Sequence, residues 1–156
     1  MPPPADHVEA VDLLWRYAFL LDDDKLEEWV ELFVEDCVYQ ILTKENLAQS
    51  LPLPLVLCDN KDMLRDRVQS LRQANIYNIH TDRHVIGLPR VRVEGDQVDL
   101  SASFSLYQTD QEGVSRLFVV GHYRDTLVRR DGNLAIKQKD VILDTAGIMT
   151  LLATPI

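Results

Sequence analysis

The chain has few of the residues that build several common kinds of site. Among its 156 residues there are only two cysteines, Cys37 and Cys58. Two isolated cysteines make neither a disulfide framework nor a zinc site, and both stand in apolar, strand-like surroundings. We therefore expect two reduced, buried thiols, which is the usual state of cysteine in a cytoplasmic protein.

Long apolar runs are also missing. No run approaches the roughly 20 residues that a helix needs to span a bilayer. The segment Met1–His7 has no basic start and no apolar core, so it does not resemble a secretory signal. These absences predict a cytoplasmic protein. The proline-rich residues 1–5 are expected to form a disordered or extended tail, and the chain length predicts a single domain at residues 6–156.

Positive charge is scarce. The chain has 16 basic and 25 acidic residues, which gives a net charge of −9. Such a surface repels phosphate groups, so we expect neither a nucleic-acid nor a membrane partner. The basic residues gather on one predicted helix and in the last predicted hairpin. The first group is Arg65, Arg67 and Arg72, and the second is Arg124, Arg129, Arg130, Lys137 and Lys139. The simplest interpretation of both groups is a solvated face, and the alternative is a contact with an acidic partner.

Motifs for covalent catalysis and phosphate binding are absent. There is no Gly-x-Ser-x-Gly sequence and no glycine-rich phosphate loop. His80 and His84 form the one candidate metal pair. They precede the apolar sequence Val85-Ile86, which favours a strand, and on a strand residues four apart are separated by roughly 13 Å. We therefore predict no metal site on this chain.

Apolar residues in the first half recur at helical spacing and predict three helices. The first helix begins after an N-cap at Asp6, and the third carries Leu64, Val68 and Leu71 on its core face. The apolar face of the first helix comprises Val8, Val11, Leu14, Trp15, Ala18 and Leu21, and that of the second Leu26, Trp29, Val30 and Phe33. We expect Trp15, Trp29 and Phe33 in the core. Strands are expected at 37–42 and 53–57, with a loop at 43–52.

In the second half the period changes from 3.6 to 2. Residues 98–106 alternate apolar and polar side chains, as in a half-buried strand, and turn signals at 94–96, 110–113 and 131–133 divide this half into four antiparallel strands. The apolar phase slips between Ile136 and Val141, which predicts a β-bulge that bends the sheet. The prediction is an α+β domain: a cone-shaped, strongly curved antiparallel or mixed sheet packed on three N-terminal helices.

A curved sheet of this kind forms a pocket at its open end. The residues expected to line it are Tyr17, Asp23, Tyr39, His84 and His122. A His–Asp or Tyr–Asp pair there could act as a general base with its orienting group, which makes His84, Asp23 and Tyr17 the catalytic candidates. The alternative is that these groups bond one another in a buried polar cluster and catalyse nothing.

Arg83 lies on a predicted strand that continues into the apolar Val85-Ile86, where an arginine needs a carboxylate. Later strands offer Asp125, Asp140 and Asp144. We expect Arg83, and likewise Arg65 and Arg67, to form either a structural ion pair or a subunit contact.

Several segments along nearly the whole chain follow one another in a recognisable order: Leu20-Leu21-Asp22, Trp29, Leu32-Phe33, Asp36-Cys37-Val38-Tyr39, 63–68, Arg83-His84-Val85-Ile86, 119–125, Leu143-Asp144-Thr145 and Pro155-Ile156. In this order they resemble the small (beta) subunits of Rieske non-haem iron, aromatic-ring-hydroxylating dioxygenases of the benzoate, terephthalate, anthranilate and salicylate type. Residues 71–77 are most similar to terephthalate- and anthranilate-type enzymes, and residues 45–53 to salicylate hydroxylases. The two segments disagree, so they leave the aromatic acid open.

The resemblance implies a ketosteroid-isomerase-like, nuclear-transport-factor-like cone fold. It also implies a mainly structural chain without cofactor or catalytic residues, assembled as three large and three small subunits. The Rieske [2Fe-2S] cluster and the mononuclear iron would lie on the large (alpha) subunit. Two other functions stay open: a free-standing isomerase or dehydratase of the same fold, and a small-ligand-binding protein, each using the His/Asp/Tyr pocket.

Overall fold

The computed structural model describes residues 1, 3–49, 53–73, 79–144 and 154–156. The segments 71–77 and 45–53, which point to different substrates, extend outside these residues. The helices are α1 (Ala5–Asp22), α2 (Leu26–Val30), α3 (Lys44–Ala48) and α4 (Lys61–Gln73). The strands are β1 (Phe33–Thr43), β2 (Val56–Cys58), β3 (Thr81–Ile86), β4 (Arg90–Glu94), β5 (Gln97–Thr109), β6 (Ser115–Arg130) and β7 (Asn133–Leu143).

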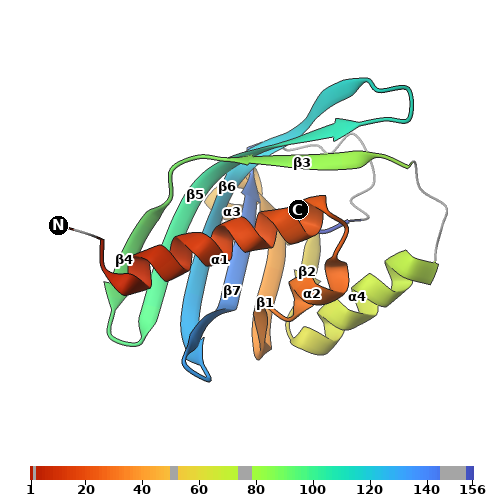
Figure 1. The fold of residues 1–156 in the computed structure, drawn as a ribbon. Coiled ribbons are helices and arrows are strands. Elements are labelled where there is room, and N and C mark those ends of the chain that lie inside the picture. Colours follow the sequence, from red (N-terminus) through yellow and green to blue (C-terminus); the bar gives the residue numbers. More distant parts are fainter. Residues whose placement is uncertain (2, 50–52, 74–78, 145–153) are drawn as a thin grey trace.

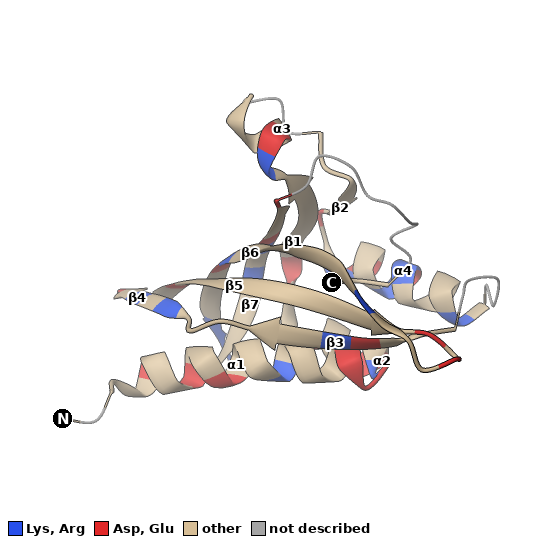
Figure 2. Cartoon of the chain, turned by 90° about the horizontal axis from the view of Figure 1, so that it is seen from above, with Lys and Arg blue, Asp and Glu red and all other residues tan. Residues whose placement is uncertain are grey.

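The strands form one seven-stranded sheet in the order β2-β1-β7-β6-β5-β3, with β4 also paired to β5. The pair β1–β7 is parallel and the other pairs are antiparallel. Helices α1, α2 and α4 lie on one side of this sheet (Figure 1), and α3 lies on the other (Figure 2). The predicted α+β architecture, helices on a curved mixed sheet, is confirmed.

Irregular pairing bends the long strands. Between β6 and β7, Thr126 faces Gln138 while Leu127 faces Ile136, so Lys137 is an extra residue in β7. This is the β-bulge predicted from the phase slip after Ile136, and it is confirmed. The close approach of β6 to the backbone of β7 requires glycine at position 121. A Cβ there would lie 2.2 Å from the carbonyl oxygen of Ile142.

Helix α1 buries a different face from the predicted one. Its buried residues are Ala10, Leu13, Leu14, Tyr17, Ala18 and Leu21, whereas Val8 and Trp15 are each 53% exposed. The prediction that Trp15 belongs to the core is therefore wrong. At about 100° per residue, the predicted face is rotated by about 80° from the buried one. Apolar residues occur almost all around this helix, so its periodicity alone could not select the buried side.

Several element boundaries also differ from the predictions. Helix α1 begins at Ala5 after Pro4, so Asp6 lies in its first turn and is not the N-cap. Phe33 is buried as predicted, but it belongs to β1 and not to the second helix. The short helix α3 occupies part of the expected loop, with the Thr43 hydroxyl accepting a hydrogen bond from the Asn46 N–H. None of the described helices is long and apolar enough to cross a membrane.

Candidate functional site

Aromatic side chains fill the interior between the sheet and its helices. Tyr17, Trp29, Phe33, Tyr39 and Tyr123 are all buried completely. The ring centroid of Trp29 lies 5.0 Å from that of Phe33 and 5.5 Å from that of Tyr39. The ring centroids of Tyr17 and Tyr123 are 5.7 Å apart, and all three pairs are edge to face. Such contacts add to the stabilisation from apolar burial, so this interior is a packed core.

A lysine–aspartate pair lies inside this aromatic cluster. Lys139 Nζ is 2.8 Å from Asp125 Oδ2 and sits over the rings of Tyr17 and Tyr123, 3.8 and 4.0 Å from their centroids. Burial lowers the pKa of Lys139 and raises that of Asp125, and the attraction between the two groups opposes both shifts. The two ring faces supplement the carboxylate as partners for the buried ammonium.

This pair corrects two predictions. Lys139 was assigned to a solvated face, yet its side chain is fully buried. Asp125 was one of the carboxylates offered to Arg83, but it binds Lys139. The alternation in β7 contains the missing signal, because Lys139 shares its parity with the buried residues Val141 and Leu143.

The hydroxyl groups of Tyr17 and Tyr39 both bond to the end of the chain. They donate to the main-chain oxygen of Ile156 at 2.6 and 3.1 Å, and the Ile156 N–H donates to the Tyr39 oxygen at 3.1 Å. Burial raises the pKa of Tyr39 to about 12 and raises that of Tyr17 as well. Both phenols therefore stay protonated at neutral pH and hold Ile156 in the core.

His84 on β3 is bound by the last residue of α1. Its Nδ1 lies 2.6 Å from Asp22 Oδ1, and its backbone N–H donates to both oxygens of the same carboxylate at 3.2 and 3.0 Å. Asp22 thus occupies the place that the sequence suggested for Asp23, which is exposed just beyond the helix end. The Nε2 of His84 is buried without a hydrogen-bond partner among the described residues, and its ring is 6.3 Å from that of Phe104.

A second histidine–aspartate pair lies at the start of β3, beside a depression of about 530 Å³. His80 Nε2 is 3.2 Å from Asp82 Oδ1 and 3.3 Å from the side-chain nitrogen of Gln108. Burial raises the pKa of Asp82. The depression is lined by Leu21, Asp22, Asp23, Asp24, Ile79, His80, Thr81, Asp82 and Thr154. Within the described part of the chain, no three His, Cys, Asp or Glu side chains gather where they could hold a metal ion.

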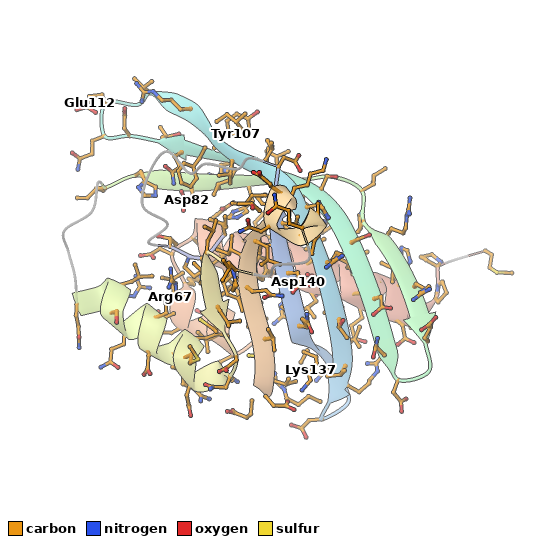
Figure 3. All side chains as sticks on the ribbon, turned by 180° about the vertical axis from the view of Figure 1, so that it is seen from behind. Arg67, Asp82, Tyr107, Glu112, Lys137 and Asp140 are labelled. Carbon is orange, nitrogen blue, oxygen red and sulfur yellow. The ribbon has the colours of Figure 1, made fainter. Side chains whose placement is uncertain are left out.

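The remaining predicted pocket residue, His122, is not part of this interior. Its neighbours Gly121 and Tyr123 on β6 are buried, and Tyr123 contacts Tyr17 of α1, so the alternation of the strand places His122 on the outward face, where it is half-buried. Asp140, another carboxylate offered to Arg83, also lies on the outward face (Figure 3). It accepts hydrogen bonds from Gln40 and Arg124.

The three predicted arginines have different surroundings. Arg65 forms ion pairs with Glu35 and Asp62, at 3.1 and 2.6 Å, on the exposed side of α4. Arg83 is exposed on β3, and no described carboxylate lies within ion-pair distance of it. Arg67 is half-buried, and its charge acts on Cys58. Burial raises the pKa of the Cys58 thiol, and the positive charge of Arg67 opposes that rise.

Both cysteines are free and buried, as predicted. Burial raises the pKa of Cys37 to about 11, so its thiolate is scarce at neutral pH. Burial and a raised pKa make both thiols poor nucleophiles.

Comparison with known proteins identifies the relatives of this chain. The family described as the SnoaL-like domain matches residues 4–140. The chain is 48% identical to the anthranilate 1,2-dioxygenase small subunit of Burkholderia cepacia, over 90% of this chain and 88% of that protein. It is 36% identical to the terephthalate 1,2-dioxygenase terminal oxygenase component subunit beta 1 of Comamonas sp., over 90% and 92% of the two chains.

A solved structure gives the same relationship. The crystal structure of a Novosphingobium aromaticivorans protein, assigned as the beta subunit of an aromatic-ring-hydroxylating dioxygenase, superposes with a TM-score of 0.87. That protein is 43% identical to this chain, and the match covers 96% of this chain and 95% of the other. The chain therefore belongs to the small (beta) subunits of aromatic-ring-hydroxylating dioxygenases, and its sheet and helices have their SnoaL-like, nuclear-transport-factor-like fold.

Proposed function

We propose that this chain is a structural subunit that holds a catalytic large subunit of an oxygenase in its assembly. The observation that carries the proposal is the filled interior. In enzymes and binding proteins, ligand sites are concave and largely pre-formed. Here the corresponding space holds the rings of Tyr17, Trp29, Tyr39 and Tyr123 together with Ile156.

The redox centres are proposed for the large subunit. A Rieske cluster needs two cysteines and two histidines, and a mononuclear non-haem iron needs two histidines and a carboxylate. Cys37 and Cys58 have no histidine nearby in the sequence, and burial raises the pKa of both thiols. Thiolate ligands are therefore disfavoured on this chain. Its own residues supply packing and contact surface.

The proposed substrate of the whole enzyme is an aromatic acid. Relatives of this chain are named for anthranilate and terephthalate, and both compounds are aromatic carboxylates. The proposed assembly is three large and three small subunits in the cytoplasm, with the small subunits also in contact with one another.

A second candidate function rests on the Asp22–His84 pair. A carboxylate on Nδ1 and a free Nε2 are the arrangement of a general base with its orienting group. A free-standing isomerase or dehydratase would use this base on a small substrate. Against it stands the burial of His84 next to Phe104, which stacks on Tyr123 at 4.3 Å.

Co-expression with a dioxygenase large subunit separates the two functions. We expect co-purification as one particle on size-exclusion chromatography and oxygen uptake that depends on an aromatic acid. The isolated small subunit should be colourless and free of iron by elemental analysis. Failure to form a complex, or a stoichiometric iron content in the isolated chain, would contradict the structural role.

Replacement of His84 by Gln gives the matched test for the second candidate. The assembled oxygenase should keep its oxygen uptake, because the iron centres are proposed for the other subunit. An isomerase or dehydratase activity of the isolated chain that disappears with His84→Gln would favour the free-standing enzyme.

A further inference from the structure

The outward side of α1 carries an apolar stripe. Val8 and Trp15 are each 53% exposed and Phe19 is 59% exposed. At about 100° per residue, these three positions fall within about 40° of one another, opposite the face that α1 buries. In Figure 1 the helix crosses in front of the sheet, and no other described helix or strand lies in front of it. A tryptophan and a phenylalanine side by side in solvent are unusual for a chain that acts alone.

A depression adjoins the stripe where α1, α2 and the start of β1 meet. It has a volume of about 340 Å³ and is lined by Arg16, Phe19, Leu20, Glu28, Glu31 and Leu32. Phe19 belongs to both features, so the stripe and the depression form one continuous surface. We call the two together the α1 outer surface.

Charge on this surface is mostly negative. Asp12 lies on the stripe and Glu28 on the rim of the depression, and no described cation is within ion-pair distance of either. Glu31 is 3.2 Å from Lys61 but remains largely exposed. Arg16 is the cation that lines the depression. The complementary partner would thus be apolar at its centre and basic at its edge.

We propose that the α1 outer surface is the docking site for the large subunit, through an apolar segment of that subunit flanked by lysine or arginine. The proposal rests on the proposed function. Tryptophan and arginine are the residue types that most often dominate binding energy, and an apolar centre with a charged rim is the usual anatomy of an interface. A second copy of this chain is a poorer fit, because it would add another net charge of −9 and a second set of these carboxylates.

The double variant Trp15→Ser/Phe19→Ser tests the site in the full chain. Its binding to the purified large subunit is measured by surface plasmon resonance, and we expect affinity to fall by about a hundredfold or more. The matched control is Leu88→Ser/Val93→Ser, which removes two exposed apolar side chains, one in the connection between β3 and β4 and one on β4 itself. The control should bind like the wild type, and thermal melts should show all three proteins folded.

The charge pattern is tested separately. Glu28→Lys should lower the association rate several-fold at low salt, and the difference should shrink as salt screens the rim. An association rate that rises with Glu28→Lys would overturn the basic character assigned to the partner.

Three results would overturn the proposal, and each is distinct. Equal binding by wild type and double variant removes the docking site but leaves the proposed function intact. Loss of small-subunit self-association by the double variant, with unchanged large-subunit binding, assigns the surface to a second copy. If neither wild type nor control binds the large subunit, the proposed function fails as well.

Discussion

The two tryptophans of this chain show two uses of the same side chain. Trp29 is fully buried, with its ring 5.9 Å from that of Tyr17 and 5.0 Å from that of Phe33, whereas Trp15 stands on the outside of α1. Tyr17 and Trp15 are two residues apart on one helix and point to opposite sides of it. The inner side holds the fold together, and the outer side leaves aromatic surface for a partner.

Ion pairs in the core and on the surface also differ in their exposure to water. Lys139 and Asp125 form a single pair among aromatic rings, out of contact with water. Arg72, on α4, bridges Asp24 and Glu27 at 2.8 Å each, on the exposed rim near the end of α1. The inner pair has lost its hydration and depends on its geometry, whereas water and salt screen the outer one.

The largest expected effect on stability comes from replacing the buried tryptophan, with the exposed one as its control. Trp29→Ala should lower the free energy of unfolding by about 3–5 kcal/mol, because it leaves a cavity in the aromatic core. Trp15→Ala should change it by about 0.5 kcal/mol or less, as is usual for surface positions. Urea denaturation of both variants measures the difference. Similar losses in the two would remove the distinction between inner and outer side.

A comparable loss is expected for the buried pair. Lys139→Met should cost about 3–5 kcal/mol, because it leaves the Asp125 carboxylate buried without its cation. The double variant Asp125→Leu/Lys139→Met removes the orphaned charge and should recover most of that loss. If the double variant is no more stable than Lys139→Met, packing and not charge explains the effect.

The hydrogen bonds between Asp22, at the end of α1, and His84 on β3 should contribute less to stability than the buried pair does. Asp22→Asn weakens charge-assisted bonds to the ring and backbone of His84, at a cost of about 1.5–3 kcal/mol. Asp23→Asn, one residue further on and exposed, should leave the unfolding midpoint unchanged. A larger effect from Asp23 than from Asp22 would contradict the observed pairing.

The smallest effect is a dependence of stability on pH. The hydrogen bond from Arg72 lowers the pKa of Glu27 to about 2. A carboxylate whose pKa is depressed by folding stabilises the protein above its unfolded pKa, near 4.3, and loses that contribution as pH falls toward about 2. Because the Glu27 side chain is 64% exposed, screening leaves about 0.5–1 kcal/mol at most.

Arg72→Met is the control for this pH effect. Denaturation curves from pH 5 down to pH 2.5 should fall less steeply in the variant, because the difference between the folded and unfolded pKa of Glu27 is then small. A slope identical to that of the wild type would show that other carboxylates dominate acid unfolding.

Sequence periodicity predicted the architecture well where one side of an element is clearly apolar. The alternation at 98–106 and the phase slip after Ile136 predicted a long strand and a bulge, and both are present. Periodicity failed for α1, where apolar residues occur on almost every side and the neighbouring elements decide which side is buried. Its failure at Trp15 is informative, because the misplaced residue marks the surface now proposed for the partner.

The candidate site was harder to predict than the fold. Residues Tyr17, Tyr39 and His84 were identified by type, but their partners were not. Ile156, Asp22 and Lys139 come from distant parts of the chain or from a position adjacent to the predicted one. A sequence displays which groups can form hydrogen bonds, and only the folded chain displays which of them meet.

By itself, the sequence determined the family, the α+β class and the alternation of the long strands, because these depend on local patterns and on the order of segments. Tertiary structure alone decided that Lys139 is buried between two tyrosines, that Asp22 rather than Asp23 binds His84, and that Trp15 faces solvent. These outcomes depend on how α1 is rotated against the sheet. That rotation is set by packing between elements far apart in the chain, which local periodicity does not record.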